Sequence, residues 1–309
     1  MDNLIPLAAQ IIREGGTVVF PTETVYGIGA NAFDPDAVAR IFEIKRRPRF
    51  NPLIVHLPSI HLIEEVAVDV PAQAMQLAEA FWPGPLTLVL PKNPGMPDIV
   101  TAGLPTIGLR MPNHPVAQSL LRAARVPIAA PSANRFGRVS PTTAQHVQDE
   151  LGNGLLVLDG GPCQVGIEST IVDCTRGVPV LLRPGAITRE QIQQACGMAP
   201  LSKEDLPHHT PRASGTLEAH YAPAAKVRLM DAKALQTGLD LLGAEAAHIA
   251  VYARAALRTP SSKLVMRRMP DDASAAAQHL FAALRAFDDQ GVKLIWIETP
   301  PATPEWEGV

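Results

Sequence analysis

The sequence predicts an α/β protein of two domains: a twisted, mixed-sheet domain, then a linker, then a small Rossmann-like α/β domain. With 309 residues the chain exceeds one ordinary hydrophobic core, so two domains are expected. Short apolar runs alternate with helical patterns, and many of the 30 prolines lie beside such runs, which indicates short strands separated by fixed turns. A polar stretch without periodicity then interrupts the pattern. We therefore expect a first domain at 1–200, a linker at 201–222 and a second domain at 223–309.

The first domain is expected to combine many short strands with few helices. Residues 17–20 form an apolar run that predicts a strand leading into the turn-rich segment 21–27. Asp34 is a typical N-cap with Pro35 at the first helical position, and Ser140 is expected to open a later helix. Further strands are predicted at 53–57, 86–90, 106–110, 127–130, 155–158, 170–173 and 180–182. So many strands among few helices favour a mixed sheet over a regular βαβ repeat.

The second domain shows strands and helices in alternation. Strands are predicted at 226–230, 248–252, 264–266 and 292–297, with helices at 232–242 and 273–289. This order is typical of a small layered α/β domain. It contains no G-x-G-x-x-G motif, and its few polar residues form no constellation, so a structural or regulatory role is expected.

Composition excludes several classes of protein. The first residues have no basic segment followed by an apolar core, and no run reaches the roughly 20 apolar residues of a membrane span. The three cysteines occur singly, which favours a reducing compartment over a disulfide framework. A cytoplasmic location is therefore expected. The net charge of −3 argues against a general polyanion binder, but residues 45–49 hold a local basic cluster.

Two segments near the N-terminus carry candidate binding residues. In 21–27, threonine hydroxyls at a strand end can bind a small polar ligand, although they can equally be satisfied by the backbone of a Pro/Gly turn. Lys45 and Arg47 offer a point charge and a planar fork suited to polyphosphate. The alternative for this pair is a solvated basic helix end, where cations are favourable against the helix dipole. His56 on its own fits a core histidine better than a ligand.

Two later segments extend the candidate set. Ser132 and Asn134 follow a strand in a turn of small residues, which lets a ligand approach the backbone, and 140–143 offers the free N–H groups of a helix start. Capping is the simpler role for Ser140. Segment 166–173 and Arg183 also lie at strand ends, where ordinary turn chemistry is the alternative. The sequence lacks the P-loop, H-E-x-x-H and G-x-S-x-G motifs and zinc spacing, so no covalent nucleophile is predicted.

Taken together, these segments resemble the L-threonylcarbamoyladenylate synthase family, whose catalytic unit is the YrdC-like domain. Six segments carry the resemblance, in the family order: Pro-Thr-Glu-Thr-Val-Tyr-Gly at 21–27, Lys-x-Arg at 45–47 with Pro-Leu at 52–53, Trp-Pro-Gly-Pro-Leu-Thr at 82–87, Ser-Ala-Asn at 132–134, Glu-Ser-Thr-Ile-Val-Asp at 168–173 and Arg-Pro-Gly at 183–185. The linker ending in His-Tyr-Ala-Pro at 220–223, followed by a small α/β domain, resembles the longer two-domain form. Family members usually continue into a final basic segment, whereas this sequence ends in Glu-Gly-Val.

The resemblance implies a nucleotidyltransferase reaction. L-threonine and bicarbonate (or CO2) give a carbamate, whose oxygen attacks the α-phosphate of ATP to form threonylcarbamoyl-AMP and pyrophosphate. Mg2+ assists and is held through the ATP phosphates rather than by protein ligands. Positioned cations lower the barrier as charge builds on the phosphoryl oxygens. A separate tRNA threonylcarbamoyl-transferase complex then uses the product, and whether this chain touches tRNA directly is left open.

The resemblance also implies roles for individual residues. The catalytic pair that contacts the ATP phosphates is expected to be Lys45 and Arg47. Further ATP-binding residues are expected to be Ser132, Asn134, Thr142, Arg183 and Tyr221. The threonine and carbamate region is expected to contain Thr22, Thr24, Tyr26, His56, Arg110 and Ser169. The linker resembles a flap over the cleft, which would bring His220 and Tyr221 near the nucleotide and keep water from a labile anhydride.

Three alternative functions stay open at this stage. A double-stranded RNA-binding module would need only the charge of 45–49, and its affinity would fall steeply with salt. A carbamoyl-transfer enzyme of hydrogenase maturation shares the YrdC-like domain, but the absence of paired cysteines counts against it. A regulatory paralogue would keep the fold without activity, against which the complete set of motifs argues.

Overall fold

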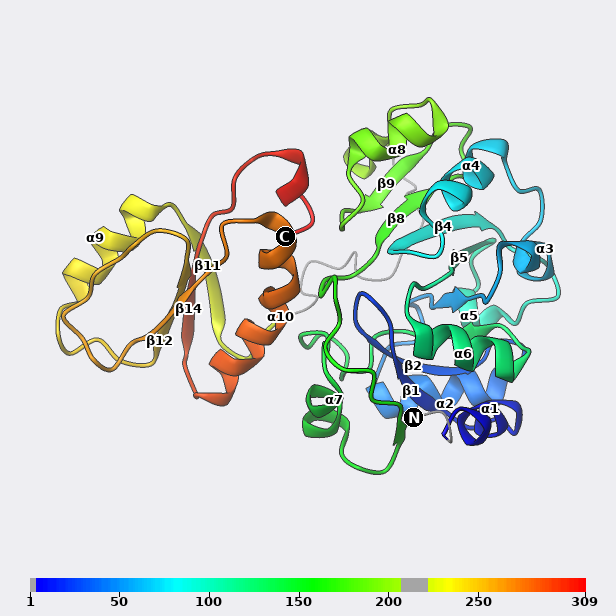
Figure 1. Cartoon of the computed structure of the whole chain (residues 1–309), viewed down its shortest axis with the longest axis horizontal. Helices are drawn as coiled ribbons and strands as arrows, with labels where there is room; N and C mark the ends of the chain where they lie inside the picture. The colour runs from blue at the N-terminus through cyan, green and yellow to red at the C-terminus, as the bar shows by residue number, and fades with distance from the viewer. Residues whose placement is uncertain (1–3, 207–221) are drawn as a thin grey trace.

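The computed structural model describes residues 4–206 and 222–309, and each of its two domains is built on its own β-sheet (Figure 1). In those ranges no helix combines the length and the apolar character needed to cross a membrane. The larger sheet has ten strands and the smaller has four. The predicted α/β class with a mixed sheet and a second small α/β domain is confirmed.

The ten-stranded sheet has the order β10-β9-β8-β4-β5-β3-β6-β2-β1-β7. Its strands are β1 (Val18–Pro21), β2 (Tyr26–Asn31), β3 (Ile54–His56), β4 (Leu86–Pro91), β5 (Thr106–Arg110), β6 (Ile128–Ala129), β7 (Leu156–Val157), β8 (Thr170–Asp173), β9 (Val180–Arg183) and β10 (Leu201–Ser202). Parallel pairs such as β3–β5 and β4–β8 stand beside antiparallel pairs such as β1–β2 and β4–β5. The sheet is therefore mixed, as the irregular order of predicted elements requires.

The first domain contains more helices than the sequence predicts. They are α1 (Ile5–Arg13), α2 (Pro35–Lys45), α3 (Ile63–Val66), α4 (Ala72–Phe81), α5 (Asp98–Thr101), α6 (Pro115–Ala124), α7 (Ala144–Leu151) and α8 (Arg189–Cys196), with 3-10 turns η1 (Ile60–Leu62) and η2 (Lys203–Asp205). The predicted start of α2 is confirmed, because Asp34 accepts from the backbone N–H groups of Asp36 and Ala37. The prediction of few helices is wrong, since α1, α4, α6 and α8 were not expected. These helices are short, and a brief apolar run in the sequence does not distinguish a helix from a strand.

The helix expected to open at Ser140 begins later. Helix α7 starts at Ala144, and the Thr143 hydroxyl caps it by accepting from the backbone N–H of His146 at 3.2 Å. The Ser140 hydroxyl instead donates to Glu168 Oε1 at 2.7 Å. Serine and threonine close together offer several caps, and the long-range contact with Glu168 decides between them.

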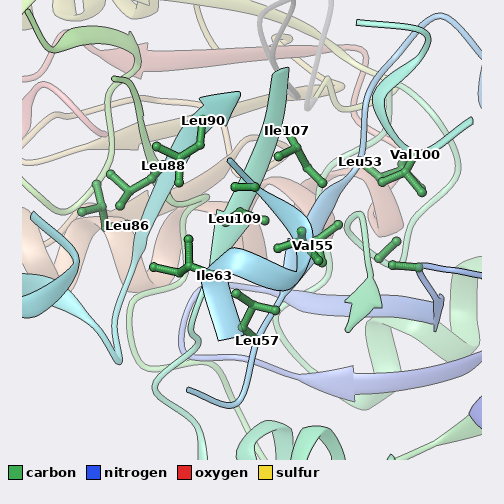
Figure 2. Packing of buried hydrophobic residues seen from close by; sticks show 14 of the residues in the cluster. Leu53, Val55, Leu57, Ile63, Leu86, Leu88, Leu90, Val100, Ile107 and Leu109 are labelled. Atoms are coloured by element: carbon green, nitrogen blue, oxygen red, sulfur yellow. The ribbon is translucent and has the colours of Figure 1, made fainter. Parts of the chain in front are cut away.

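The core of the first domain lies on both faces of the sheet. Figure 2 shows leucines of β4 (Leu86, Leu88, Leu90) packed beside side chains of β3 and β5 such as Val55 and Leu109. All five are fully buried, and each contributes roughly 1.5–3 kcal/mol through removal from water. On another part of the sheet α1 and α6 pack together over β1. Burial on both faces explains why the strands read as continuous apolar runs.

The second domain is a four-stranded parallel sheet of order β11-β14-β12-β13. Its elements are β11 (Lys226–Met230), α9 (Ala232–Leu242), β12 (Ile249–Ala253), β13 (Val265–Arg268), α10 (Ala273–Asp289), β14 (Leu294–Glu298) and η3 (Pro304–Trp306). Each was expected from the sequence except η3. The expected linker start differs, because Leu201–Ser202 pairs with β9 and so extends the large sheet.

The two domains contact each other along α10, which faces the first domain in Figure 1. Gly166 packs so closely on α10 that a Cβ there would lie 2.5 Å from Cα of Gln278. Near the C-terminus, Arg189 pairs with Glu307 at 2.9 Å. These contacts place the second domain beside the segments 163–168 and 183–189, which carry candidate site residues.

Candidate functional site

A pocket lies where several strands of the large sheet end. It is lined by Thr22, Val25, Gly27, Arg47, Ile54, His56, Arg110, Ala130, Pro131, Ser132, Glu168, Ser169 and Arg183. Strands β3 and β5 run parallel with His56 opposite Arg110, so both side chains come from carboxyl ends of neighbouring strands. Seven of the predicted site residues therefore line one pocket, although they come from seven separate segments of the chain.

Lys45 lies at the end of α2, directly behind the pocket wall. Its ammonium donates to the carbonyl of Ser132 at 2.6 Å and to that of Asn134. Burial lowers the pKa of Lys45 well below its ordinary value, and the nearby Arg47 lowers it further. No carboxylate within the described residues forms an ion pair with this lysine, and the carbonyl oxygens of Ser132 and Asn134 are its hydrogen-bond partners.

Arg47 follows because Arg46 adopts a left-handed conformation (φ 51°) that ends the helix and turns the chain. Its Nη2 donates to the Pro52 carbonyl at 3.0 Å, and its guanidinium lies 5.8 Å from the centre of the Phe136 ring. The arginine is only 7% exposed. The sequence alternative of a solvated basic helix end is therefore wrong for Lys45 and Arg47.

Arg110 is the centre of a second polar group. It pairs with Glu23 at 2.6 Å, and both side chains are 4% exposed. Its Nη1 donates to the Thr24 hydroxyl at 2.8 Å, and that hydroxyl lies 2.9 Å from the hydroxyl of Thr22. Burial, with Arg110 nearby, lowers the pKa of His56 to about 3, so this imidazole is neutral at pH 7. This part of the pocket is polar and fixed in position by a buried ion pair.

Arg183 and Glu168 form the third group. Arg183 donates from Nε to the Ser169 carbonyl at 2.9 Å and from Nη2 to the Ser169 hydroxyl at 3.1 Å. Its Nη2 also lies 3.7 Å from Glu168 Oε2. The Ser169 hydroxyl in turn lies 2.8 Å from that of Thr87, beneath the pocket. The β8–β9 pair thus supplies a cation, a carboxylate and a hydroxyl to one wall.

Not every predicted residue reaches the pocket. The hydroxyl of Tyr26 donates to the Gly161 carbonyl at 2.8 Å, and burial raises its pKa. Thr142 is buried and contacts His146. Neither lines the pocket. Asn134 contributes its carbonyl to Lys45, while its amide nitrogen donates to the carbonyls of Arg135 and Arg138. The predicted residues His220 and Tyr221 lie outside the described residues.

Sequence reasoning missed Glu23 and Glu168, which balance Arg110 and Arg183. Both stand inside segments selected for their hydroxyls, and neither was given a role of its own. One signal in the sequence could have identified them. Each is a single carboxylate at a strand end, and Arg110 and Arg183 at other strand ends need carboxylate partners. A buried arginine is stable only when a carboxylate or carbonyl satisfies it.

The pocket wall combines three arginines with hydroxyls and the carboxylate of Glu168, and Lys45 and Glu23 lie buried behind it. Such a site suits a ligand with several phosphate oxygens, since fixed cations and N–H donors replace the hydration of the phosphates. It also suits an amino acid, whose carboxylate matches an arginine fork and whose amine matches a carboxylate or hydroxyl.

Comparison with known proteins shows similarity along the whole chain. A family model described as "Telomere recombination" (Sua5_yciO_yrdC) matches residues 10–185, and one described as "Threonylcarbamoyl-AMP synthase, C-terminal domain" matches residues 187–309. A threonylcarbamoyl-AMP synthase of Pyrococcus abyssi is 41% identical over 303 residues, covering 95% of this chain and 88% of that protein. One of Bacillus subtilis is 41% identical over 311 residues, covering 98% and 89%.

Solved structures agree with these relatives. The crystal structure of P. abyssi Sua5 complexed with L-threonine matches with a TM-score of 0.90 and 39% identity, covering 100% of this chain and 92% of that one. The predicted family, its longer form and its activity are confirmed. The chain therefore belongs to the two-domain, Sua5-type threonylcarbamoyl-AMP synthases, nucleotidyltransferases that use ATP as a substrate in tRNA threonylcarbamoyladenosine biosynthesis.

Proposed function

We propose that the pocket between Thr22 and Arg183 is where this enzyme joins L-threonine, bicarbonate or CO2, and ATP. One observation carries the proposal: side chains from seven segments bring cations, hydroxyls and a buried Arg110–Glu23 pair to one pocket. The complex of P. abyssi Sua5 with L-threonine supports a threonine site in the same fold. We assign Lys45 and Arg47 to the ATP phosphates, and Arg110 to the substrate carboxylate.

The chemistry follows from these assignments. The threonine amine adds to CO2 and loses a proton, giving a carbamate. A carbamate oxygen then bonds to the α-phosphorus of ATP as the bond to pyrophosphate breaks. Negative charge grows on the phosphoryl oxygens and on pyrophosphate, and Lys45, Arg47 and Arg183 lie where they stabilise it. The neutral His56 adds no second positive charge beside Arg110, whose guanidinium is oriented by Glu23 and Thr24.

We propose that Mg2+ joins the site through the ATP phosphates. Glu168 is the carboxylate among the described residues that line the pocket; its Oε1 accepts from the Ser140 hydroxyl, and its Oε2 lies 3.7 Å from Arg183 Nη2. This donor set fits an ion that takes one carboxylate, phosphate oxygens and water. The ion would supply charge neutralisation on the leaving pyrophosphate.

The remaining assignments are proposals from the family resemblance. Ser132, Asn134 and Thr142 are assigned to the nucleotide, and Thr22, Thr24, Tyr26 and Ser169 to the threonine region. Of these, Thr24, Tyr26, Asn134 and Thr142 act only indirectly, because they do not line the pocket. The 201–222 segment with Tyr221 is proposed as a flap. A tRNA threonylcarbamoyl-transferase complex is the proposed recipient of the product, and the cytoplasm the proposed location.

The first experiment measures pyrophosphate release by the purified full chain with ATP, Mg2+, L-threonine and bicarbonate, omitting each in turn. We expect release to require all four. Lys45→Met, which keeps the length of the side chain, and Arg47→Ala should each lower kcat/KM by at least about 100-fold, because each removes a cation from the phosphates.

The matched control is Arg49→Ala, which removes an exposed charge from the same basic cluster. It should keep wild-type turnover. If Arg47→Ala and Arg49→Ala are equally active in synthesis but equally weak in binding double-stranded RNA, the pocket assignment is wrong and the RNA-binding alternative gains support.

A further inference from the structure

The second domain holds a loop of the first domain that forms part of the pocket wall. This β6–α7 loop (residues 130–143) contacts Arg285 of α10. Arg285 donates from Nε to the Ser140 carbonyl at 3.4 Å and from Nη2 to the Val139 carbonyl. Its Nη2 also pairs with Glu150 Oε2 at 2.8 Å, and the two side chains are only 13% and 9% exposed. An arginine buried in this way is a fixed contact rather than a surface ion pair.

The same loop reaches the pocket at two places. At its start, the carbonyls of Ser132 and Asn134 accept from the ammonium of Lys45, and the backbone N–H of Phe136 donates to the carbonyl of Lys45 at 2.9 Å. At its other end, the fully buried Ser140 donates to Glu168 Oε1. The loop therefore sets the position of both a cation and a carboxylate.

Two more contacts tie this loop to α10. Glu150 Oε1 accepts from the backbone N–H of Arg135 at 3.0 Å, so one carboxylate bridges the loop and Arg285. At the end of α10, Asp288 pairs with Arg138 at 3.2 Å and accepts from the backbone N–H groups of Ala224 and Ala225. The last two turns of α10 thus hold the loop from 135 to 140.

We propose that Arg285 is a positioning residue for catalysis, acting through the Val139 and Ser140 carbonyls to keep Lys45 and Glu168 aimed at the nucleotide. The proposal rests on the assignment of the pocket as the ATP site. Loss of these hydrogen bonds frees the loop to shift, and misplacement of catalytic groups by about 1 Å is costly because the reaction depends on their orientation. The second domain then contributes to catalysis because α10 holds the 130–143 loop in place.

The test measures kcat, KM for ATP and thermal unfolding for full-length Arg285→Ala, Ser140→Ala and the double variant, well below their unfolding temperatures. We expect kcat of Arg285→Ala to fall about tenfold or more. The double variant should show a decrease in kcat no larger than that of the more impaired single variant. Both changes interrupt the same series of contacts, from Arg285 through Ser140 to Glu168. Arg285→Lys should regain at least about threefold, since a lysine still donates to a carbonyl and pairs with Glu150.

Arg189→Ala is the matched control, because it removes another interdomain ion pair that does not touch the loop. It should keep kcat within about twofold. Wild-type kcat in Arg285→Ala, or losses that multiply in the double variant, would overturn the proposal. If Arg285→Ala does not fold, Glu150→Gln decides: kcat reduced about threefold supports the proposal and wild-type kcat overturns it.

Arg47→Ala separates this proposal from the site assignment. An active Arg47→Ala would refute the pocket as the ATP site. An inactive Arg47→Ala together with a fully active Arg285→Ala would refute only the positioning role.

Discussion

At the scale of single residues, the site depends on charges and imidazoles held out of water. Lys45, Arg110 and His56 are each at most 4% exposed, yet each has a defined environment: carbonyls for the lysine, Glu23 for the arginine, and burial as a neutral ring for the histidine. Burial favours the neutral form of lysine and histidine, whereas a paired arginine stays charged. Burial thus lowers the pKa of both Lys45 and His56.

The neutral state of His56 predicts a loss of stability in mild acid. Its pKa is about 3 in the folded protein and about 6.5 when unfolded, so only the unfolded chain gains this proton between those values. The contribution of His56 to the free energy of unfolding is therefore fully present above pH 6.5 and decreases as the pH falls toward 3. Between pH 7 and pH 5 the decrease is about 2 kcal/mol. The measurement is urea unfolding of wild type and His56→Gln at pH 7 and pH 5. The loss of unfolding free energy between these pH values should be larger in the wild type by this amount. Equal losses in the two proteins would contradict the prediction.

The sequence predicted most of the polar residues at the site but not how they pair. Hydroxyls and Arg183 were found because they stand at strand ends beside turns, and Lys45 because it belongs to a basic cluster at a helix end. Glu23 and Glu168 were missed because the need for a carboxylate becomes visible only when the sheet brings Arg110 and Arg183 next to them. Tyr26 was expected at the pocket, but a period of two along β2 turns its side chain toward Asp159 and Gly161. Contacts between distant segments are the part that local patterns do not contain.

At the scale of elements, helix α2 positions Lys45 and Arg47, the two cations that we assign to the ATP phosphates. Its N-terminus is fixed by Asp34, and its C-terminus delivers Lys45 and, after one left-handed residue, Arg47. Cap residues could be predicted because they act within a few positions of the chain. The helices α1, α4, α6 and α8 could not, because their short apolar runs have no long period, and their packing on the sheet decides their structure.

Removal of the α2 cap should destabilise the first domain measurably. Asp34 accepts from two backbone N–H groups, at 3.0 and 3.1 Å, so Asp34→Ala should lower the free energy of unfolding by about 1 kcal/mol, and Asp34→Ser should restore most of it. Chemical denaturation provides the measurement. Asp36→Ala removes a charge from the same helix end without removing the cap and should cost less than half as much; equal losses would show that charge, not capping, matters.

At the scale of the whole molecule, the close packing of the two domains is the main feature. Gly166 has φ of +78°, and α10 passes directly over it. Figure 1 shows α10 as the element of the second domain that faces the first. Because Arg285, Asp288 and Gln278 all lie on this helix, a small displacement of α10 reaches several parts of the pocket wall.

Gly166→Ala should separate the domains. Its Cβ would lie 2.5 Å from the Gln278 backbone, so α10 must move, whereas Gly177 has φ of +80° with nothing within 4 Å. Both alanine variants carry the left-handed strain of about 1 kcal/mol, and only Gly166→Ala adds about 1–3 kcal/mol of overpacking. Small-angle X-ray scattering should give a larger radius of gyration for Gly166→Ala alone. The same radius and unfolding free energy in both variants would contradict this.

The strand order of the large sheet has a consequence for how the protein is made. Strand β1 pairs with β7 through Val18 and Leu156, and β4 pairs with β8 through Leu86 and Thr170. Contacts so far apart in sequence form late, because closing long loops costs entropy. A nascent chain on the ribosome therefore cannot close this sheet until β8 and β9 have emerged, and these bring Ser169 and Arg183 with them. These two strands, which are among the last synthesised in the first domain, complete the pocket wall, so a chain that ends before them lacks part of the proposed site.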